Sequence, residues 1–171
     1  MSHARPPALT GRDNCYEDFE VGAVYAHARG KTLTEMDNVL LTNLVMNTAQ
    51  AHFNEDAMAG TPFATRITFG GITAAMVIGL ASEDTAEQAV AELGLDKVRF
   101  LAPVRHGDTL YAYSEVLDKH DGDRPGAGEV RFRHYGVNQD RRLVFQGERR
   151  VLLRRREAAR RAPPEAGRWP G

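Results

Sequence analysis

The feature that most constrains this fold is one short, strongly apolar segment in the middle of the chain. Residues 72–81, ITAAMVIGLA, contain no charged side chain and follow the pair Gly70-Gly71. A helix that crosses a membrane needs about 20 apolar residues, so this segment is too short to do so. Because a helix that is apolar on nearly all sides belongs inside a protein, we predict a buried helix over residues 70–84.

The segments around this helix predict an antiparallel sheet. Residues 22–33 alternate as a strand does, and Thr34 then begins a helix that runs to about residue 46. From residue 98 onward the pattern is β, with stretches rich in Val, Tyr, Phe and Leu at 109–118, 129–138 and 143–154. One strand, then helices, then about four strands with short connections predict an α+β fold, in which an antiparallel sheet wraps around one buried central helix.

The composition excludes several classes of function. The 171 residues are 42% hydrophobic and 26% charged and carry a net charge of −1, so no global field attracts nucleic acid or an anionic membrane. The single cysteine, Cys15, excludes an internal disulfide, and no signal peptide is visible, so we expect a cytoplasmic protein. The spacing of the His and carboxylate residues predicts no metal site, and no nucleophile elbow or phosphate loop occurs.

We expect a single compact domain, residues 15–155, between two flexible ends. Residues 1–14 contain Pro6-Pro7, and residues 156–171 contain further prolines and much of a basic stretch, RRREAARR. This stretch is either a solvated tail or a contact for phosphate groups. It contains no aromatic residue, which argues against binding of nucleic acid.

Three stretches together resemble the MaoC-like (R)-specific enoyl-thioester hydratases and dehydratases, a family with the hotdog fold. NTAQAHFNE at 47–55 resembles the hydratase motif, in which an acidic residue precedes a histidine by five positions. TRITFGGITAAMV at 65–77 resembles the segment that opens the central helix. VRFLAPVRHGDTL at 98–110 resembles the strand and the Gly-Asp turn that follow that helix. The resemblance extends over residues 16–153 and implies a single hotdog domain.

The motif around His52 departs from the usual pattern at two positions. Asn47 stands where the family usually has aspartate, and Gln50 stands where proline is usual. The mesaconyl-CoA hydratase branch carries a similar MNT…H version of this motif. Histidine titrates near neutral pH and suits a general base or acid, whereas the Asn47 amide cannot take a proton and can only hold a water molecule.

The resemblance implies a site in which His52 and Asn47 act on water and the amides of Gly70, Gly71 and Ile72 bind the thioester oxygen. The first N–H groups of a helix have no partner within it and carry the positive end of its dipole. Glycine also lets a ligand approach those amides closely. Each residue has a purely structural alternative: a histidine that closes a helix, an asparagine that caps one, and a glycine pair that permits close packing.

The predicted function is reversible hydration or dehydration of an enoyl thioester, with coenzyme A or an acyl carrier protein as the carrier and no other cofactor. The resemblance also implies a homodimer or a dimer of dimers with its sites at subunit interfaces. Arg66, Arg99 and Arg105 are candidate contacts for the phosphates of the carrier, or surface charges. Two alternatives stay open. The same pocket can serve amine addition or thioester hydrolysis, or the chain can be a non-catalytic hotdog subunit.

Overall fold

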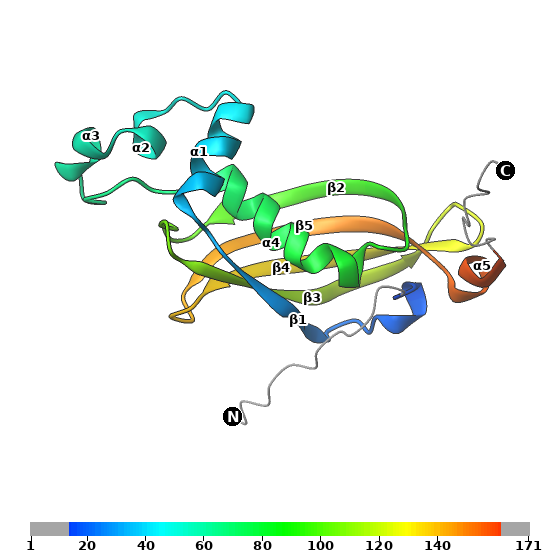
Figure 1. The fold of residues 1–171 in the computed structure, drawn as a ribbon. Helices are drawn as coiled ribbons and strands as arrows, with labels where there is room; N and C mark the ends of the chain where they lie inside the picture. The colour runs from blue at the N-terminus through cyan, green and yellow to red at the C-terminus, as the bar shows by residue number, and fades with distance from the viewer. Residues whose placement is uncertain (1–13, 162–171) are drawn as a thin grey trace, which may run out of the picture.

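One five-stranded antiparallel sheet organises the computed structural model, which describes residues 14–161 (Figure 1). The strand order is β1-β3-β4-β5-β2, so β1 and β2 form the two edges. The strands are β1 (Val24–Thr32), β2 (Ala89–Phe100), β3 (Thr109–Asp121), β4 (Ala127–Asn138) and β5 (Leu143–Arg154). The sheet agrees with the predicted α+β fold.

The longest helix, α4 (Gly70–Thr85), lies along one face of this sheet, as predicted for residues 70–84 (Figure 1). Three short helices gather near the end of the sheet where α4 begins, namely α1 (Glu35–Leu44), α2 (Gln50–Phe53) and α3 (Glu55–Ala59). A 3-10 helix, η1 (Tyr16–Asp18), and a C-terminal helix, α5 (Arg156–Arg161), lie at the opposite end. The expectation of irregular structure after α1 is corrected in one detail, since His52 lies in α2.

The core lies between α4 and the sheet. Ile72, Val77 and Ala81 of α4 are buried and pack with strand residues that include Leu110 and Phe145. The exposed residues Ala75 and Gly79 lie on the other side of α4. A second buried cluster fills the other half of the sheet, beneath η1; it contains Phe19, Tyr25, Val116, Val130, Phe132, Val151 and Leu153.

The approach of α4 to the sheet requires a glycine at one position. Gly136 lies on the buried side of β4, and a Cβ atom there would overlap the side chain of Val77. It would also lie 3.1 Å from Cβ of Phe145. Only a residue without a side chain allows the helix to lie this close, so Gly136 helps to set the height of α4 above the sheet.

Strand β2 begins at Ala89, nine residues before the β pattern that we recognised at residue 98. It is an edge strand and is exposed along most of its length, so its apolar residues do not alternate with polar ones as in a half-buried strand. Ala, Glu and Leu in its first half also favour helices when they are judged in isolation. Pairing with β5 outweighs this local preference.

The structure also differs from our expectation for the C-terminal tail. Residues 156–161, expected to be flexible, form α5. The backbone N–H of Arg156 donates to Glu17 at 3.0 Å, and its guanidinium pairs with Asp18. Arg155 and Arg156 of the stretch RRREAARR are therefore tied to acidic groups of η1. Residues 1–13 and 162–171, which make up the rest of the two predicted flexible ends, lie outside the described residues.

Candidate functional site

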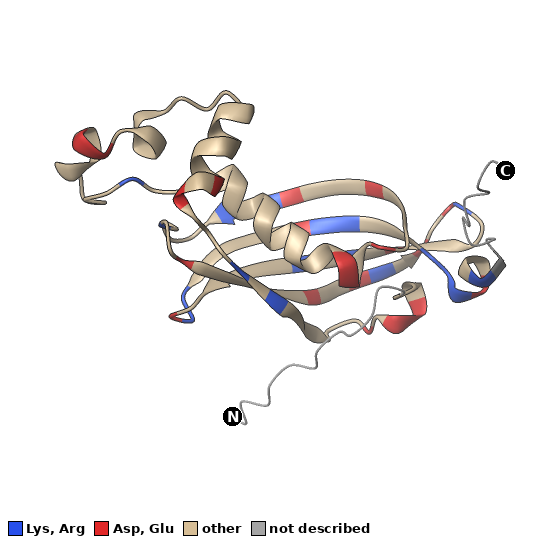
Figure 2. Cartoon of the chain, in the orientation of Figure 1, with Lys and Arg blue, Asp and Glu red and all other residues tan. Residues whose placement is uncertain are grey.

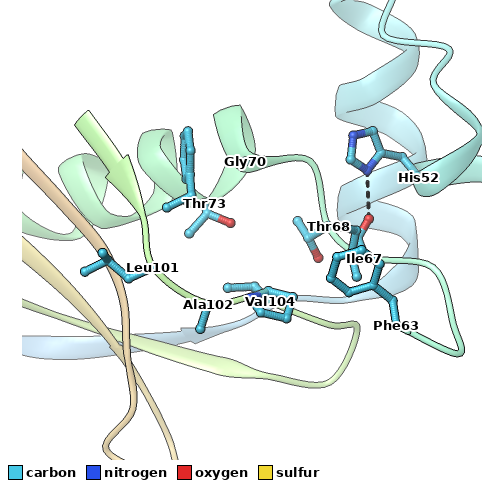
Figure 3. A pocket seen from close by; sticks show the side chains of 11 residues that line it. His52, Phe63, Ile67, Thr68, Gly70, Thr73, Leu101, Ala102 and Val104 are labelled. Atoms are coloured by element: carbon cyan, nitrogen blue, oxygen red, sulfur yellow. Dashed lines mark hydrogen bonds between the residues drawn. The ribbon is translucent and has the colours of Figure 1, made fainter. Parts of the chain in front are cut away.

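A cavity of about 370 Å³ opens where α4 begins, between the loop that leads into this helix and the segment that follows β2. His52 and Gly70 border it on one side, and Ala102 and Val104 on the opposite side (Figure 3). Most of the remaining lining is apolar; the full set is His52, Phe63, Ile67, Thr68, Gly70, Thr73, Phe100, Leu101, Ala102, Pro103 and Val104. No lysine, arginine or carboxylate is among these residues.

His52 presents one nitrogen that can accept a proton. Its Nδ1 lies 2.8 Å from the carbonyl oxygen of Ile67, which can only accept, so Nδ1 carries the hydrogen (Figure 3). The neutral ring therefore has an unprotonated Nε2, and this atom makes no hydrogen bond to any of the described residues. The ring also packs against Phe69, with 5.5 Å between the ring centroids. A histidine held in this way is chemically able to take a proton from a bound molecule.

A buried asparagine, Asn38, holds His52 next to the start of α4. Its Nδ2 donates to the carbonyl oxygen of His52 at 3.0 Å, and its Oδ1 accepts from the N–H of Phe69 at 3.1 Å. The predicted capping box anchors the helix that carries Asn38, since the Thr34 hydroxyl accepts from Asp37 N and the Asp37 carboxylate from Thr34 N. The backbone hydrogen bond from Thr34 is the main cause of the lowered pKa of Asp37.

The start of α4 offers two backbone donors. The N–H groups of Ile72 and Thr73 both bond to the carbonyl of Phe69, at 2.9 and 3.3 Å. In contrast, the N–H groups of Gly70 and Gly71 have no partner among the described residues. An added Cβ at Gly70 would lie 3.0 Å from the Phe100 ring, and one at Gly71 would lie 2.5 Å from the Phe69 ring. The glycine pair therefore permits close packing. Of its two free amides, that of Gly70 belongs to a residue that lines the cavity, and Gly71 is not a lining residue.

The other predicted site residues differ in where they lie. Ile72 is buried in the core and its N–H is already used, so it offers the cavity no free amide. Asn47 is not one of the lining residues. Its Oδ1 accepts from the N–H of Ala49 at 3.2 Å, and its own N–H donates to the carbonyl of Thr42 at 2.9 Å. In the single chain Asn47 thus joins α1 to α2 and lies outside the cavity.

The three arginines also differ. Arg66 is held by two carboxylates, with Nε 2.7 Å from Glu55 and Nη2 2.5 Å from Glu35. Hydrogen bonds from Thr65 and Arg66 lower the pKa of Glu55 to about 2, so both partners are charged at neutral pH. Figure 2 shows the lysines and arginines of the described chain concentrated on the strands and α5. Arg66 is the one lysine or arginine between residues 33 and 69.

Arg105 and Arg99 lie closer to the opening of the cavity. Arg105 is exposed, and its Nη2 donates to the carbonyl of Phe63, a lining residue, at 3.3 Å. Arg99 is exposed on β2 beside Phe100 and forms no ion pair with the described residues. These two guanidinium groups are better placed than Arg66 to meet a charged carrier.

Sequence reasoning missed two residues of the site, Asn38 and Thr68. The usual burial pattern of an amphipathic helix is reversed in α1. Its polar residues Asn38 and Thr42 are buried, whereas its apolar residues Met36, Leu40 and Leu44 are exposed. The two buried polar residues are four positions apart, which places them on the same face of the helix. This spacing is the one feature of the sequence that indicates a polar buried face. Thr68 lines the cavity with a buried hydroxyl, and its position in TRITFGG carries no periodic signal.

No three His, Cys, Asp or Glu side chains of residues 14–161 gather in a way that could hold a metal ion. No helix in this range combines the length and the apolar character that crossing a membrane requires.

Comparison with known proteins gives one consistent family. The sequence matches the model of the mesaconyl-CoA hydratase family over residues 10–155. It is 36% identical to mesaconyl-CoA hydratase of Haloarcula marismortui over 143 residues, which are 81% of this chain and 38% of that protein. It is 34% identical to the (R)-specific enoyl-CoA hydratase of Rhodospirillum rubrum over 81% of this chain and 90% of that one.

The fold agrees with these relatives. A putative MaoC domain dehydratase of Chloroflexus aurantiacus superimposes with a TM-score of 0.78 at 28% identity, over 85% of this chain and 46% of that one. The chain thus spans less than half the length of the mesaconyl-CoA hydratases that it matches. The described domain is a single hotdog domain, and the chain belongs to the mesaconyl-CoA hydratase branch of the MaoC-like family.

Proposed function

We propose that this chain catalyses the reversible hydration of an enoyl thioester in the cavity at the start of α4. One observation carries the proposal: a histidine with a free Nε2 borders the same apolar cavity as Gly70, the first residue of a helix whose first two amides are free. Hydration needs both groups, because a base must activate water while a donor stabilises the negative charge that develops on the thioester oxygen. The names of the relatives, hydratases and dehydratases of CoA esters, agree with this chemistry.

The proposed reaction assigns one role to each group. A water molecule gives a proton to Nε2 of His52 while its oxygen forms a bond to C3 of the enoyl thioester. The electrons of the C2–C3 double bond move toward the carbonyl, whose oxygen faces the amides of Gly70 and Gly71. His52 then returns the proton to C2, and the reverse sequence expels water. An amide directed at such an oxyanion typically lowers the barrier by about 3 kcal/mol.

The apolar lining supports the same role. Phe63, Ile67, Phe100 and Leu101 replace water around the reacting atoms, and electrostatic interactions are stronger in such surroundings than in bulk solvent. The absence of a lining carboxylate makes thioester hydrolysis a poorer fit, because no group of this kind is placed to attack the carbonyl or activate water against it. No observation favours amine addition over hydration.

The acyl group is carried by coenzyme A or by an acyl carrier protein in this proposal, and no other cofactor takes part. Both carriers bring phosphate groups, which arginine binds well. Arg105 at the opening and Arg99 on β2 are the candidate phosphate contacts. Arg66 is a weaker candidate since Glu35 and Glu55 already neutralise it.

A second copy of the chain completes the proposed enzyme. β2 is an edge strand that exposes Leu93, Leu95 and Val98, and an unpaired edge strand is a ready template for pairing with another chain. Ile78 of α4 lies beside this edge, in a shallow pocket that it shares with Leu93 and Leu95. We propose a homodimer with continuous sheets and a site at each subunit interface, or a dimer of dimers. The buried single cysteine, Cys15, fits a reducing cytoplasm.

The test is a product assay with a panel of 2-enoyl-CoA thioesters that includes branched and dicarboxylic acyl groups. Turnover is followed by the loss of the enoyl absorbance, and the products are identified by mass. Wild type should form a water adduct, and His52→Ala should form almost none. Free acid would identify a thioesterase, and an amine adduct would identify amine addition. A protein that turns over no CoA or carrier-protein ester would be a non-catalytic subunit.

A further inference from the structure

The cavity beside His52 offers an apolar environment to the molecule that binds in it. Seven of its eleven lining residues have apolar side chains, among them Phe63, Ile67 and Val104. The polar side chains of the lining are those of His52, Thr68 and Thr73, and each is uncharged when His52 carries its single proton on Nδ1. Hydrocarbon is stabilised when it leaves water for such surroundings, so the lining favours an apolar ligand.

The cavity has an open end and a closed end. Phe63, Phe100 and Leu101 are each at least 38% exposed, so they border the opening. Thr73 and Val104 are each at most 3% exposed and form the closed end. The candidate contacts for the phosphates of the carrier lie near the opening. Because the carrier is large and charged, it stays at the opening, and the acyl group points toward the closed end.

A carboxylate on the acyl group meets no cation in this cavity. No lysine or arginine of the described residues lines it, and the nearby Arg66 is already held by two carboxylates. Basic residues line a different cavity, of about 490 Å³ between β1 and α4, where Arg29 and Lys31 lie, but His52 is not among its lining residues. A carboxylate that leaves water without gaining a cationic partner is strongly disfavoured.

We propose that this cavity selects an enoyl thioester whose acyl group is apolar and uncharged, and that it discriminates against an acyl group with a second carboxylate. The inference rests on the proposed hydration activity and names the substrate class for it. Mesaconic acid is dicarboxylic, so the proposal separates this chain from the relatives that are named for mesaconyl-CoA. The apolar side chains bury the acyl group, while water and the thioester meet His52 and the start of α4.

The first experiment compares substrates of the same shape on the wild-type protein. Fumaryl-CoA carries a carboxylate on C3, and its isopropyl analogue carries there an uncharged group with the same number of heavy atoms. The analogue should be hydrated with a kcat/KM about a hundredfold higher or more, because the carboxylate enters the lining unpaired. A third substrate, with an amide in place of the carboxylate, should fall between the two, since an amide is polar but uncharged.

Binding without turnover separates recognition from reactivity. The saturated esters succinyl-CoA and its isopropyl analogue cannot add water, so their competition with a good substrate measures binding alone. The isopropyl ester should have an inhibition constant about tenfold lower than that of succinyl-CoA, or lower still. Equal inhibition constants would show that the cavity tolerates the charge and would overturn the inference.

One substitution tests the lining itself. Leu101 borders the opening with an exposed side chain, so a longer residue fits there and can extend inward. Leu101→Arg adds a cation to the lining and should raise the ratio of kcat/KM for fumaryl-CoA to that for its isopropyl analogue about tenfold. Leu101→Gln is the matched control, polar but uncharged, and should leave this ratio close to that of wild type. Contacts with the carrier are common to both substrates and cancel in the ratio.

Three further results would decide against the inference. If wild type hydrates fumaryl-CoA as fast as its isopropyl analogue or faster, the substrate class is wrong while the proposed hydration stands. A ratio that changes equally in Leu101→Arg and Leu101→Gln would show that a cation in the lining is not what decides. If wild type hydrates no enoyl thioester at all, the proposed function fails and this inference fails with it.

Discussion

His52 Nδ1 lies 2.8 Å from the carbonyl oxygen of Ile67, and this contact leaves Nε2 as the ring nitrogen that is able to take a proton. The contact also ties α2 to the segment that leads into α4, so it links His52 to the start of the helix that carries the free amides. A carbonyl partner at Nδ1 is a common way to hold a histidine in one tautomer and orientation. The relationship therefore leads directly to a test of which nitrogen acts.

Substitution of His52 by two amides should distinguish anchoring from catalysis. The amide of His52→Asn can approximate Nδ1 and keep a donor for Ile67, but it provides no base; His52→Gln can approximate Nε2, again without basicity. Both variants should fold like wild type and lose at least about 100-fold in kcat, the usual contribution of a general base. Steady-state kinetics on enoyl-CoA and circular dichroism measure the two properties. Near-normal turnover by either variant would exclude His52 as the base.

Asn38 should matter for both stability and activity. Asn38→Leu removes one donor and one acceptor and leaves the part-buried Phe69 N–H and His52 carbonyl without these partners. At about 1–3 kcal/mol for each unsatisfied group, we expect a loss of several kcal/mol in unfolding free energy, measured by urea denaturation. Activity should fall too, because His52 loses its link to α4.

Asn43→Leu on the same helix is the control for Asn38→Leu. Asn43 is exposed and donates to a backbone carbonyl within α1, so its loss should change unfolding free energy by about 0.5 kcal/mol at most. An Asn38 variant as stable and active as this control would show that the buried bridge is dispensable.

The parts of the fold that sequence predicts well are those with a repeating pattern and a buried face. The central helix and strands β1, β3, β4 and β5 have such patterns, and each lies close to its predicted range. β2 was recognised only from residue 98, because the first part of an exposed edge strand has no apolar face to display. The periodic spacing of apolar residues indicates which face of an element is buried. It therefore gives no prediction where burial depends on a partner or on a single contact.

The candidate site shows the same limit. His52 and Gly70, both singled out in the sequence, line one cavity, whereas Gly71 does not; their roles there stay predictions. The pairing of Arg66 with Glu35 and Glu55 depends on a fold that brings residues 31 and 11 positions apart together, which local pattern does not reveal. The inward direction of Asn38 follows from tertiary packing, since the apolar residues of α1 predict the opposite face as buried.

The contact between α4 and β4 gives a prediction for stability alone. Gly136→Ala places a Cβ against Val77 and Phe145, and neither the helix nor the strand can move without disturbing the core. Overpacking of this kind costs about 1–3 kcal/mol of unfolding free energy. Gly60→Ala is the matched change at a glycine with open space around it and an ordinary backbone conformation; it should be neutral or stabilise by up to about 1 kcal/mol. Denaturant midpoints for both variants test this. Equal midpoints would mean that α4 lies higher above the sheet.

A buried chain of polar groups joins α4 to three strands and makes the domain sensitive to acid. Asp84 lies 2.6 Å from His27 Nδ1, Ser114 lies 2.7 Å from His27 Nε2, and His134 Nδ1 lies 2.7 Å from the same hydroxyl. If both rings are neutral, His27 donates to Asp84, the Ser114 hydroxyl donates to His27, and His134 Nδ1–H donates to Ser114. Burial lowers the pKa of His27, and burial with the nearby charge of Arg149 lowers the pKa of His134 to about 3.

The sign of the pH effect follows from these pKa values. An unfolded histidine titrates near its ordinary pKa of 6.5, whereas folded His134 stays neutral down to about pH 3, so between these limits the unfolded chain binds the extra proton. Stability from His134 is complete above pH 6.5 and falls by about 1.4 kcal/mol per pH unit below it, with a further loss from His27. His134→Gln should flatten the decline of melting temperature between pH 6.5 and 4.5, whereas His120→Gln, at an exposed position, should leave the slope unchanged. Parallel curves for wild type and His134→Gln would mean that the ring is not buried in its neutral form.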